Sequence, residues 1–210
     1  MTVEASLVNM KFCTNCICTW HTESSTVVIA EPHTDCPEHG AAAADVMVGK
    51  CWGVGRTLLT PLDLQPWMVD PRKIAQSLSK ICRFAGQCAG FVPVAFHSVN
   101  VMCHVRDVQG ITDNKILKTA LMHDAPEGCG LQDMIRPVKR HPAMMQYEQW
   151  HDDSYRVIAQ VLDLCDPMPR YIKLADDAVL AEELANFNDP YYGMDPLNAY
   201  EFFMHHWTKL

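Results

Sequence analysis

Residues 120–127 contain the feature that most constrains how this chain can fold. An apolar stretch ends there in adjacent His123 and Asp124, and an imidazole nitrogen beside a carboxylate oxygen suits a borderline divalent metal. His97 lies upstream and Asp176 downstream, each inside a segment predicted to be helical, and both can supply further ligands. A metal site shared by these residues requires segments that are distant in the sequence to meet in one core.

Most of the chain is predicted to be helical, so we expect an all-α fold. Asp70 followed by Pro71 is a typical helix start, with the acid as the N-cap and proline in the first turn. Gly128 and Gly130 are expected to end the helix that carries the His–Asp pair. Strand and turn are expected for residues 49–66. The predicted helices cover residues 71–81, 94–105, 114–124, 147–164 and 170–187.

The first forty residues differ from the rest because they hold two ligand pairs at zinc-site spacing. The expected ligands are Cys13, Cys16, Cys36 and His39, with Cys18, His21 and His33 as spare candidates. Two such pairs can close a tetrahedral structural zinc site, which would stabilise a segment too small for a core of its own. The alternative is a flexible arm with unliganded thiols. We expect a zinc-binding arm over residues 1–45 and a second domain over residues 46–210.

The 210-residue chain carries a formal charge of -8, which argues against broad nucleic-acid binding, because such binding needs lysine and arginine to neutralise phosphates. No apolar run approaches the roughly 20 residues of a transmembrane helix, and the first residues lack a signal-peptide core. Ten cysteines without a secretion signal favour metal ligands and reduced thiols over disulfides. We therefore expect a cytoplasmic protein.

A series of short motifs runs in order through residues 48–186. The motifs are Gly55-Arg56, Pro61-Leu62-Asp63, residues 74–78 and 81–84, His97-Ser98-Val99, residues 123–127, Pro137-Val138-Lys139 and Lys173-x-Ala175-Asp176. This combination resembles the small HD-domain nucleotide phosphohydrolases, which include the bacterial 5′-deoxynucleotidases. It is most similar to a phage-encoded branch, the dATP triphosphohydrolases of phages with 2-aminoadenine in their DNA. The resemblance implies a compact HD-domain helical bundle.

The resemblance also assigns metal ligands and two catalytic acids. The implied ligands of a divalent ion (Co, Mn, Zn or Mg) are His97, His123, Asp124 and Asp176. Glu127 is implied as general base or water-positioning group. Asp133 matches another family acid, which polarises the water or protonates the leaving group, although this chain is one residue longer between the two acids than the commoner family pattern. Asp177 competes with its neighbour Asp176, and we expect Asp177 to point to solvent.

The implied substrate site is built from one aromatic residue and three cations. These are Arg83, Phe84, Lys139 and Lys173. The cations match positions that hold phosphates, and a net-acidic protein must gather positive charge locally to receive a triphosphate. Phe84 is a candidate platform for stacking the base, with core packing as its competing use. Ala85 and Gly86 would then line the base edge and set its tolerance for a 2-amino group.

We therefore expect a metal-dependent dATP triphosphohydrolase that removes dATP from the nucleotide pool in favour of 2-aminoadenine DNA. A 5′-deoxynucleotidase acting on monophosphates is the first alternative, because it needs the same metal set. A zinc-bearing binding module with a degenerate HD core is the second. Related enzymes often form multimers, so we expect a homo-oligomer, located in the host cytoplasm if phage-encoded. We expect no membrane partner and no stable nucleic-acid binding.

Overall fold

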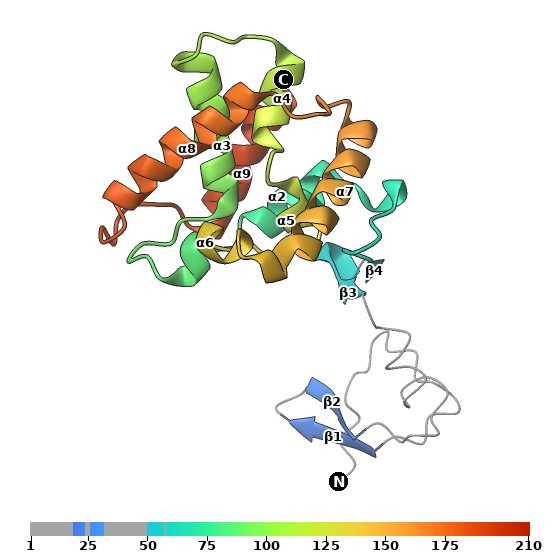
Figure 1. Ribbon diagram of the computed structural model, residues 1–210. Helices are drawn as coiled ribbons and strands as arrows, with labels where there is room; N and C mark the ends of the chain where they lie inside the picture. The colour runs from blue at the N-terminus through green and yellow to red at the C-terminus, as the bar shows by residue number, and fades with distance from the viewer. Residues whose placement is uncertain (1–18, 24–25, 32–49, 57) are drawn as a thin grey trace. The chain divides into compact units, whose positions relative to one another are not determined.

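The computed structural model describes residues 19–23, 26–31, 50–56 and 58–210. The chain divides into two compact units, Met1–Lys50 and Cys51–Leu210, where the sequence predicted a boundary after residue 45. Most of the described residues are helical, which confirms the predicted dominance of helix (Figure 1). Among these residues, no helix combines the length and the apolar character needed to cross a membrane.

The described part of the first unit is a two-stranded antiparallel sheet. Strand β1 (Thr19–Glu23) pairs with β2 (Thr26–Glu31), with Thr22 opposite Val27. The β-branched run at the start of β2 favours this extended pairing. The predicted zinc ligands Cys13, Cys16, Cys36 and His39 lie outside the described residues, as do the spare candidates Cys18 and His33. The zinc site therefore stays a prediction.

The second unit starts with a short antiparallel pair and continues as a helical bundle. Strand β3 (Cys51–Trp52) pairs with β4 (Leu58–Leu59). The helices are α2 (Pro71–Leu78), α3 (Val94–Asp107), α4 (Asn114–Leu121), α5 (Ala125–Gly128), α6 (Arg136–Lys139), α7 (Met145–Leu162), α8 (Arg170–Ala185) and α9 (Pro196–Lys209). Short 3-10 turns lie at Val54–Arg56, Pro66–Met68, Arg83–Gly86 and Pro142–Met144.

Helix α3 is the centre of the bundle, since it packs against α4, α8 and α9 (Figure 1). Its buried residues face several directions, as expected of a helix surrounded by others. Helix α9 covers one side of the bundle through Phe203, which is fully buried, so the aromatic C-terminal segment packs on the body. This arrangement brings the buried faces of α3 and α8 together, and both carry predicted ligands.

Helices α2 and α5 pack unusually closely, and Gly128 permits the contact. A Cβ atom added at Gly128 would lie 3.0 Å from both the carbonyl oxygen and the Cγ2 atom of Ile74. Helix α2 begins as predicted, because the Asp70 side chain accepts a hydrogen bond from the Arg72 amide and Pro71 occupies the first turn. This close contact holds α5, which carries Glu127, against α2.

The predicted continuation of a helix through His123 and Asp124 is wrong. Helix α4 ends at Leu121, and the His–Asp pair lies in the turn that connects it to α5. Pro126 explains the break, because proline has no amide hydrogen for the helical hydrogen bond and its ring crowds the carbonyl four residues earlier. The turn leaves both side chains free to point into the space beside α3.

Asp113 is the N-cap of α4, and its side chain accepts a hydrogen bond from the Ile116 amide at 3.0 Å. We expect Asp113→Ala to lower the free energy of unfolding by about 1 kcal/mol, because that amide then loses its partner. Urea titration of the full chain measures the change. Asp113→Ser is the matched control, since serine also caps helices and should retain most of the stability; an equal loss in both variants would contradict the capping role.

Candidate metal centre

The Nε2 atoms of His97 and His123 lie close together in the interior of the bundle. The Nδ1 atom of His123 donates to the carbonyl oxygen of Ala120 at 2.8 Å, which leaves its Nε2 lone pair free. The Nδ1 atom of His97 is 2.9 Å from a carboxylate oxygen of Glu183. Both Nε2 atoms are buried without a hydrogen-bond partner among the described residues. Two buried, unpartnered imidazole nitrogens are what a divalent metal requires.

Asp124 and Asp176 bring carboxylate oxygens to these nitrogens. Asp124 Oδ2 lies 3.1 Å from Nε2 of His123 and 3.7 Å from Nε2 of His97. Asp176 Oδ1 lies 3.2 Å from Nε2 of His97. The ligand atoms of His97, His123 and Asp124 all lie within 4.8 Å of one another, so these three can hold a metal ion. Asp176 is outside that group but contacts it through His97.

A second group of ligand atoms shares Asp124. It consists of Asp124, Glu127 and His151, again with all atoms within 4.8 Å of one another. Helix α7 packs against α5, which brings His151 to Glu127 (Figure 1). Glu127 Oε2 and His151 Nε2 are buried and have no hydrogen-bond partner in the described part of the chain. The five residues of the two groups therefore form one continuous cluster of candidate metal ligands, called the metal cluster below.

The environments of Asp124 and Glu127 shift their pKa values in opposite directions. Burial disfavours the charge of Asp124, but His123, His97 and Arg83 outweigh it and hold the pKa of Asp124 well below its usual range. Burial raises the pKa of Glu127 well above its usual range, and the negative charges of Asp124 and Asp133 add to the effect. Such a divergence separates an ionised ligand from a group suited to proton transfer.

Asp133 and Lys139 lie at the edge of the cluster. Burial and the charge of Asp124 raise the pKa of Asp133, against the opposing effect of Arg83. The Lys139 ammonium lies 5.7 Å from the centre of the Tyr147 ring and acts electrostatically on both Glu127 and Asp133. These two predicted site residues are therefore near the metal ligands, although neither is a ligand in the two groups.

Arg83 is buried and held by acids on both sides. Its Nε atom donates to Glu183 Oε2 at 2.9 Å, and its NH1 atom lies 3.8 Å from Asp124 Oδ2. The Arg83 amide also donates to the carbonyl of Val92 at 2.8 Å, which ties the residue to the segment before α3. The guanidinium of this predicted phosphate-binding residue is thus fixed beside the metal cluster.

Three consecutive left-handed residues follow Arg83. Phe84, Ala85 and Gly86 have φ values of 58°, 51° and 70°. Left-handed conformations of non-glycine residues cost free energy and concentrate at functional sites. The half-buried Phe84 ring makes an edge-to-face contact with Phe187 at 5.4 Å between centroids, while Ala85 and Gly86 are exposed. Phe84 thus has a packing partner and also lies beside Arg83.

Lys173 is paired within its own helix. It forms ion pairs with Asp176 and, at 3.1 Å, with Asp177, and Arg136 binds the same two acids at 3.1 and 2.6 Å. Asp177 is exposed, whereas Asp176 is buried. These pairs occupy Oδ2 of Asp176, while its Oδ1 faces His97.

Three residues of the site have no counterpart in the sequence prediction: Glu183, His151 and Arg136. Glu183 follows Asp176 by seven residues, two helical turns, so an acid on the buried face of α8 was a usable signal. His151 lies between Tyr147 and Tyr155 at four-residue spacing on the inner face of α7, which also places it inside. Arg136 offers no such signal, because its partners are set by tertiary packing.

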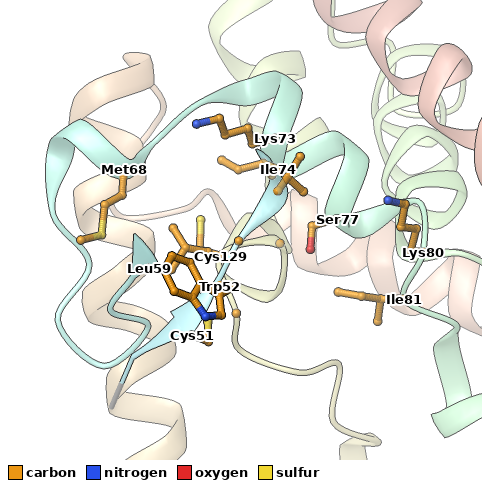
Figure 2. A pocket seen from close by; sticks show the side chains of 14 residues that line it. Cys51, Trp52, Leu59, Met68, Lys73, Ile74, Ser77, Lys80, Ile81 and Cys129 are labelled. Carbon is orange, nitrogen blue, oxygen red and sulfur yellow. The ribbon is translucent and has the colours of Figure 1, made fainter. Parts of the chain in front are cut away.

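A separate pocket of about 210 Å³ lies away from this chemistry. Figure 2 shows lining side chains that come from β3, β4, α2 and the turn after α5, among them Trp52, Ile74 and Cys129. None of the lining residues belongs to the metal cluster, so this pocket is not the candidate active site.

Comparison with known proteins gives one similarity to report. No protein-family model matches the chain. Over 110 residues the chain is 36% identical to the uncharacterized protein YfdR of Escherichia coli K12, and the match covers 52% of this chain and 56% of YfdR. The chain thus spans about half the length of the curated relative it matches. This similarity assigns neither a family nor an activity.

Proposed function

We propose that this chain is a divalent-metal-dependent phosphohydrolase of deoxynucleotides with an HD-type metal site. The observation that carries the proposal is the convergence of two imidazole Nε2 atoms, from His97 and His123, on the carboxylate of Asp124. Asp176 supplies the fourth ligand from α8. The order of these residues in the sequence resembles that of the HD-domain phosphohydrolases, which supports the same assignment.

The residues around the metal ligands supply the remaining chemistry. A divalent ion held there supplies a Lewis acid that lowers the pKa of a water molecule and offsets charge on phosphorus. Glu127 orients the attacking water and accepts its proton. Arg83 and Lys139 hold phosphate oxygens. Asp133 donates a proton to the 5′-oxygen as its bond to phosphorus breaks.

The proposed substrate is dATP, with deoxyadenosine and triphosphate as products. Four basic side chains border the cluster, Arg83, Arg136, Lys139 and Lys173, and this positive charge favours a polyphosphate over a monophosphate. Phe84 provides a face for the base. A buried 2-amino group without a partner costs about 1–3 kcal/mol, so we expect roughly 5- to 150-fold selectivity for dATP over 2-amino-dATP.

Chromatographic product analysis on the purified full chain tests the proposal. The substrates are dATP, 2-amino-dATP, dGTP and dAMP, each with Mn²⁺, with Co²⁺ and with chelator. We expect metal-dependent release of deoxyadenosine and triphosphate from dATP, at a higher kcat/KM than from the other three. Competition between dATP and 2-amino-dATP in one reaction measures the selectivity directly.

Three other outcomes would each contradict part of the proposal. Equal rates on dATP and 2-amino-dATP would remove the pool-cleansing role and leave a general deoxynucleotide phosphohydrolase. A higher kcat/KM on dAMP would replace the triphosphohydrolase by a 5′-deoxynucleotidase. A chain that binds metal and hydrolyses none of the four would contradict the proposed function.

A further inference from the structure

Glu183 is a fully buried acid whose two carboxylate oxygens are both used. Oε1 lies 2.9 Å from Nδ1 of His97 on α3, and Oε2 accepts a hydrogen bond from Nε of Arg83 at 2.9 Å. Its side chain has no exposed surface. A buried acid is retained only when it is paired and hydrogen-bonded, and here each oxygen has a different partner.

These contacts determine which nitrogen of His97 carries the proton. A carboxylate paired with a guanidinium only accepts hydrogen bonds, so Nδ1 of His97 must be the donor. The Nε2 atom then keeps its lone pair and faces the carboxylates of Asp176 and Asp124. A carboxylate behind a histidine ligand fixes the ring orientation and increases the basicity of the ligating nitrogen.

The same carboxylate fixes the residue that faces the phosphates. Arg83 precedes the left-handed turn at Phe84–Gly86, and its NH1 atom reaches toward Asp124 at 3.8 Å while its Nε atom is held by Glu183. Glu183 thus holds the Nε edge of the guanidinium, and the NH1 atom faces the metal cluster. Glu183 is therefore the link between a metal ligand on α3 and a phosphate-binding residue outside that helix.

We propose that Glu183 is a positioning residue that couples metal binding at His97 to phosphate binding at Arg83. This inference rests on the proposed metal centre and adds a residue that the resemblance does not assign. A merely structural ion pair would stabilise the bundle without affecting the His97 tautomer, the metal affinity or KM. Those three quantities distinguish the two roles.

Glu183→Gln is the informative substitution because it keeps the size and removes one acceptor. An amide has one oxygen and one NH₂ group, and both of its partners need an acceptor. If the NH₂ group faces His97, the ring must move its proton to Nε2, where the metal binds. If the NH₂ group faces Arg83, two donors meet and the guanidinium loses its anchor. Neither orientation preserves both contacts.

The first measurement needs no substitution at Glu183. Long-range ¹H–¹⁵N NMR of the metal-free, full-length wild-type chain reports which ring nitrogen of His97 carries the proton, with His97→Asn used for assignment. We expect the Nδ1–H tautomer. A His97 ring that carries its proton on Nε2 and none on Nδ1 would overturn the proposal, even if every variant at position 183 failed to fold.

The second measurement compares Glu183→Gln with Glu182→Gln, a matched change at the exposed neighbouring acid. If the amide NH₂ group faces His97, calorimetric titration should show a roughly 10- to 100-fold weaker affinity for Co²⁺ in Glu183→Gln. If it faces Arg83, hydrolysis kinetics should show a KM for the nucleotide raised roughly ten-fold or more. Glu182→Gln should change neither. If Glu183→Gln folds and retains both wild-type values, the proposal fails while the proposed function stands. If the wild-type chain binds no Co²⁺ and hydrolyses no nucleotide, the proposed function fails first.

Discussion

Asp124→Asn is expected to abolish hydrolysis and to remove most of the bound metal. Asp124 is the one residue shared by both ligand groups, with His97 and His123 on one side and Glu127 and His151 on the other. An amide keeps the size of the side chain but loses the negative charge that balances a divalent ion. Losing one protein ligand should remove most of the affinity, because water cannot supply the same geometry. Metal content and kcat, measured with metal in excess, test this.

His123→Ala should give the same result, because His123 contributes the adjacent ligand atom. Asp177→Asn is the control, since Asp177 is an exposed acid next to a proposed ligand and contacts Arg136 and Lys173 instead. We expect that variant to keep the metal and most of the activity. Full activity of Asp124→Asn at saturating metal would show that the cluster does not form the catalytic site.

Local sequence patterns predicted α2, α3, α4, α7 and α8, because those signals act over a few residues, but did not predict α5, α6 or α9. The N-cap and proline marked the start of α2, and the predicted helices over residues 94–105, 147–164 and 170–187 correspond to α3, α7 and α8. The predicted end of α4 was wrong because the helix was expected to end at Gly128. Pro126 comes earlier in the chain and already interrupts the helical hydrogen bonds.

The candidate metal ligands could be predicted as residues, but their hydrogen-bond and ion-pair partners could not. Glu183 meets His97 across 86 positions of sequence, and Arg83 meets Glu183 across 100. Such contacts depend on how α8 packs on α3, and one sequence gives no register for that packing. For the same reason, the pairing of Lys173 with Asp176 and Asp177 could not be separated from a phosphate-binding role.

Glu127→Gln is expected to lower kcat by roughly two to four orders of magnitude while metal and substrate still bind, as for the loss of an acid–base group. The Glu127 carboxylate is buried beside Asp124 and Asp133, and its Oε2 atom has no hydrogen-bond partner among the residues described. The negative charges of Asp124 and Asp133 repel a charged Glu127 carboxylate, and an uncharged amide of the same size removes this repulsion. The variant should therefore be at least as stable as the wild-type chain, because active sites commonly trade stability for activity.

The combination of lower kcat and undiminished stability distinguishes catalysis from packing. A packing role predicts that activity and the free energy of unfolding fall together, whereas an acid–base role predicts that only kcat falls. Glu148→Gln, at an exposed acid of α7, is the matched control and should change neither quantity. An effect confined to KM would make Glu127 a binding residue, and loss of metal along with kcat would make it a ligand. Only a loss of kcat with metal, KM and stability retained supports proton transfer by Glu127.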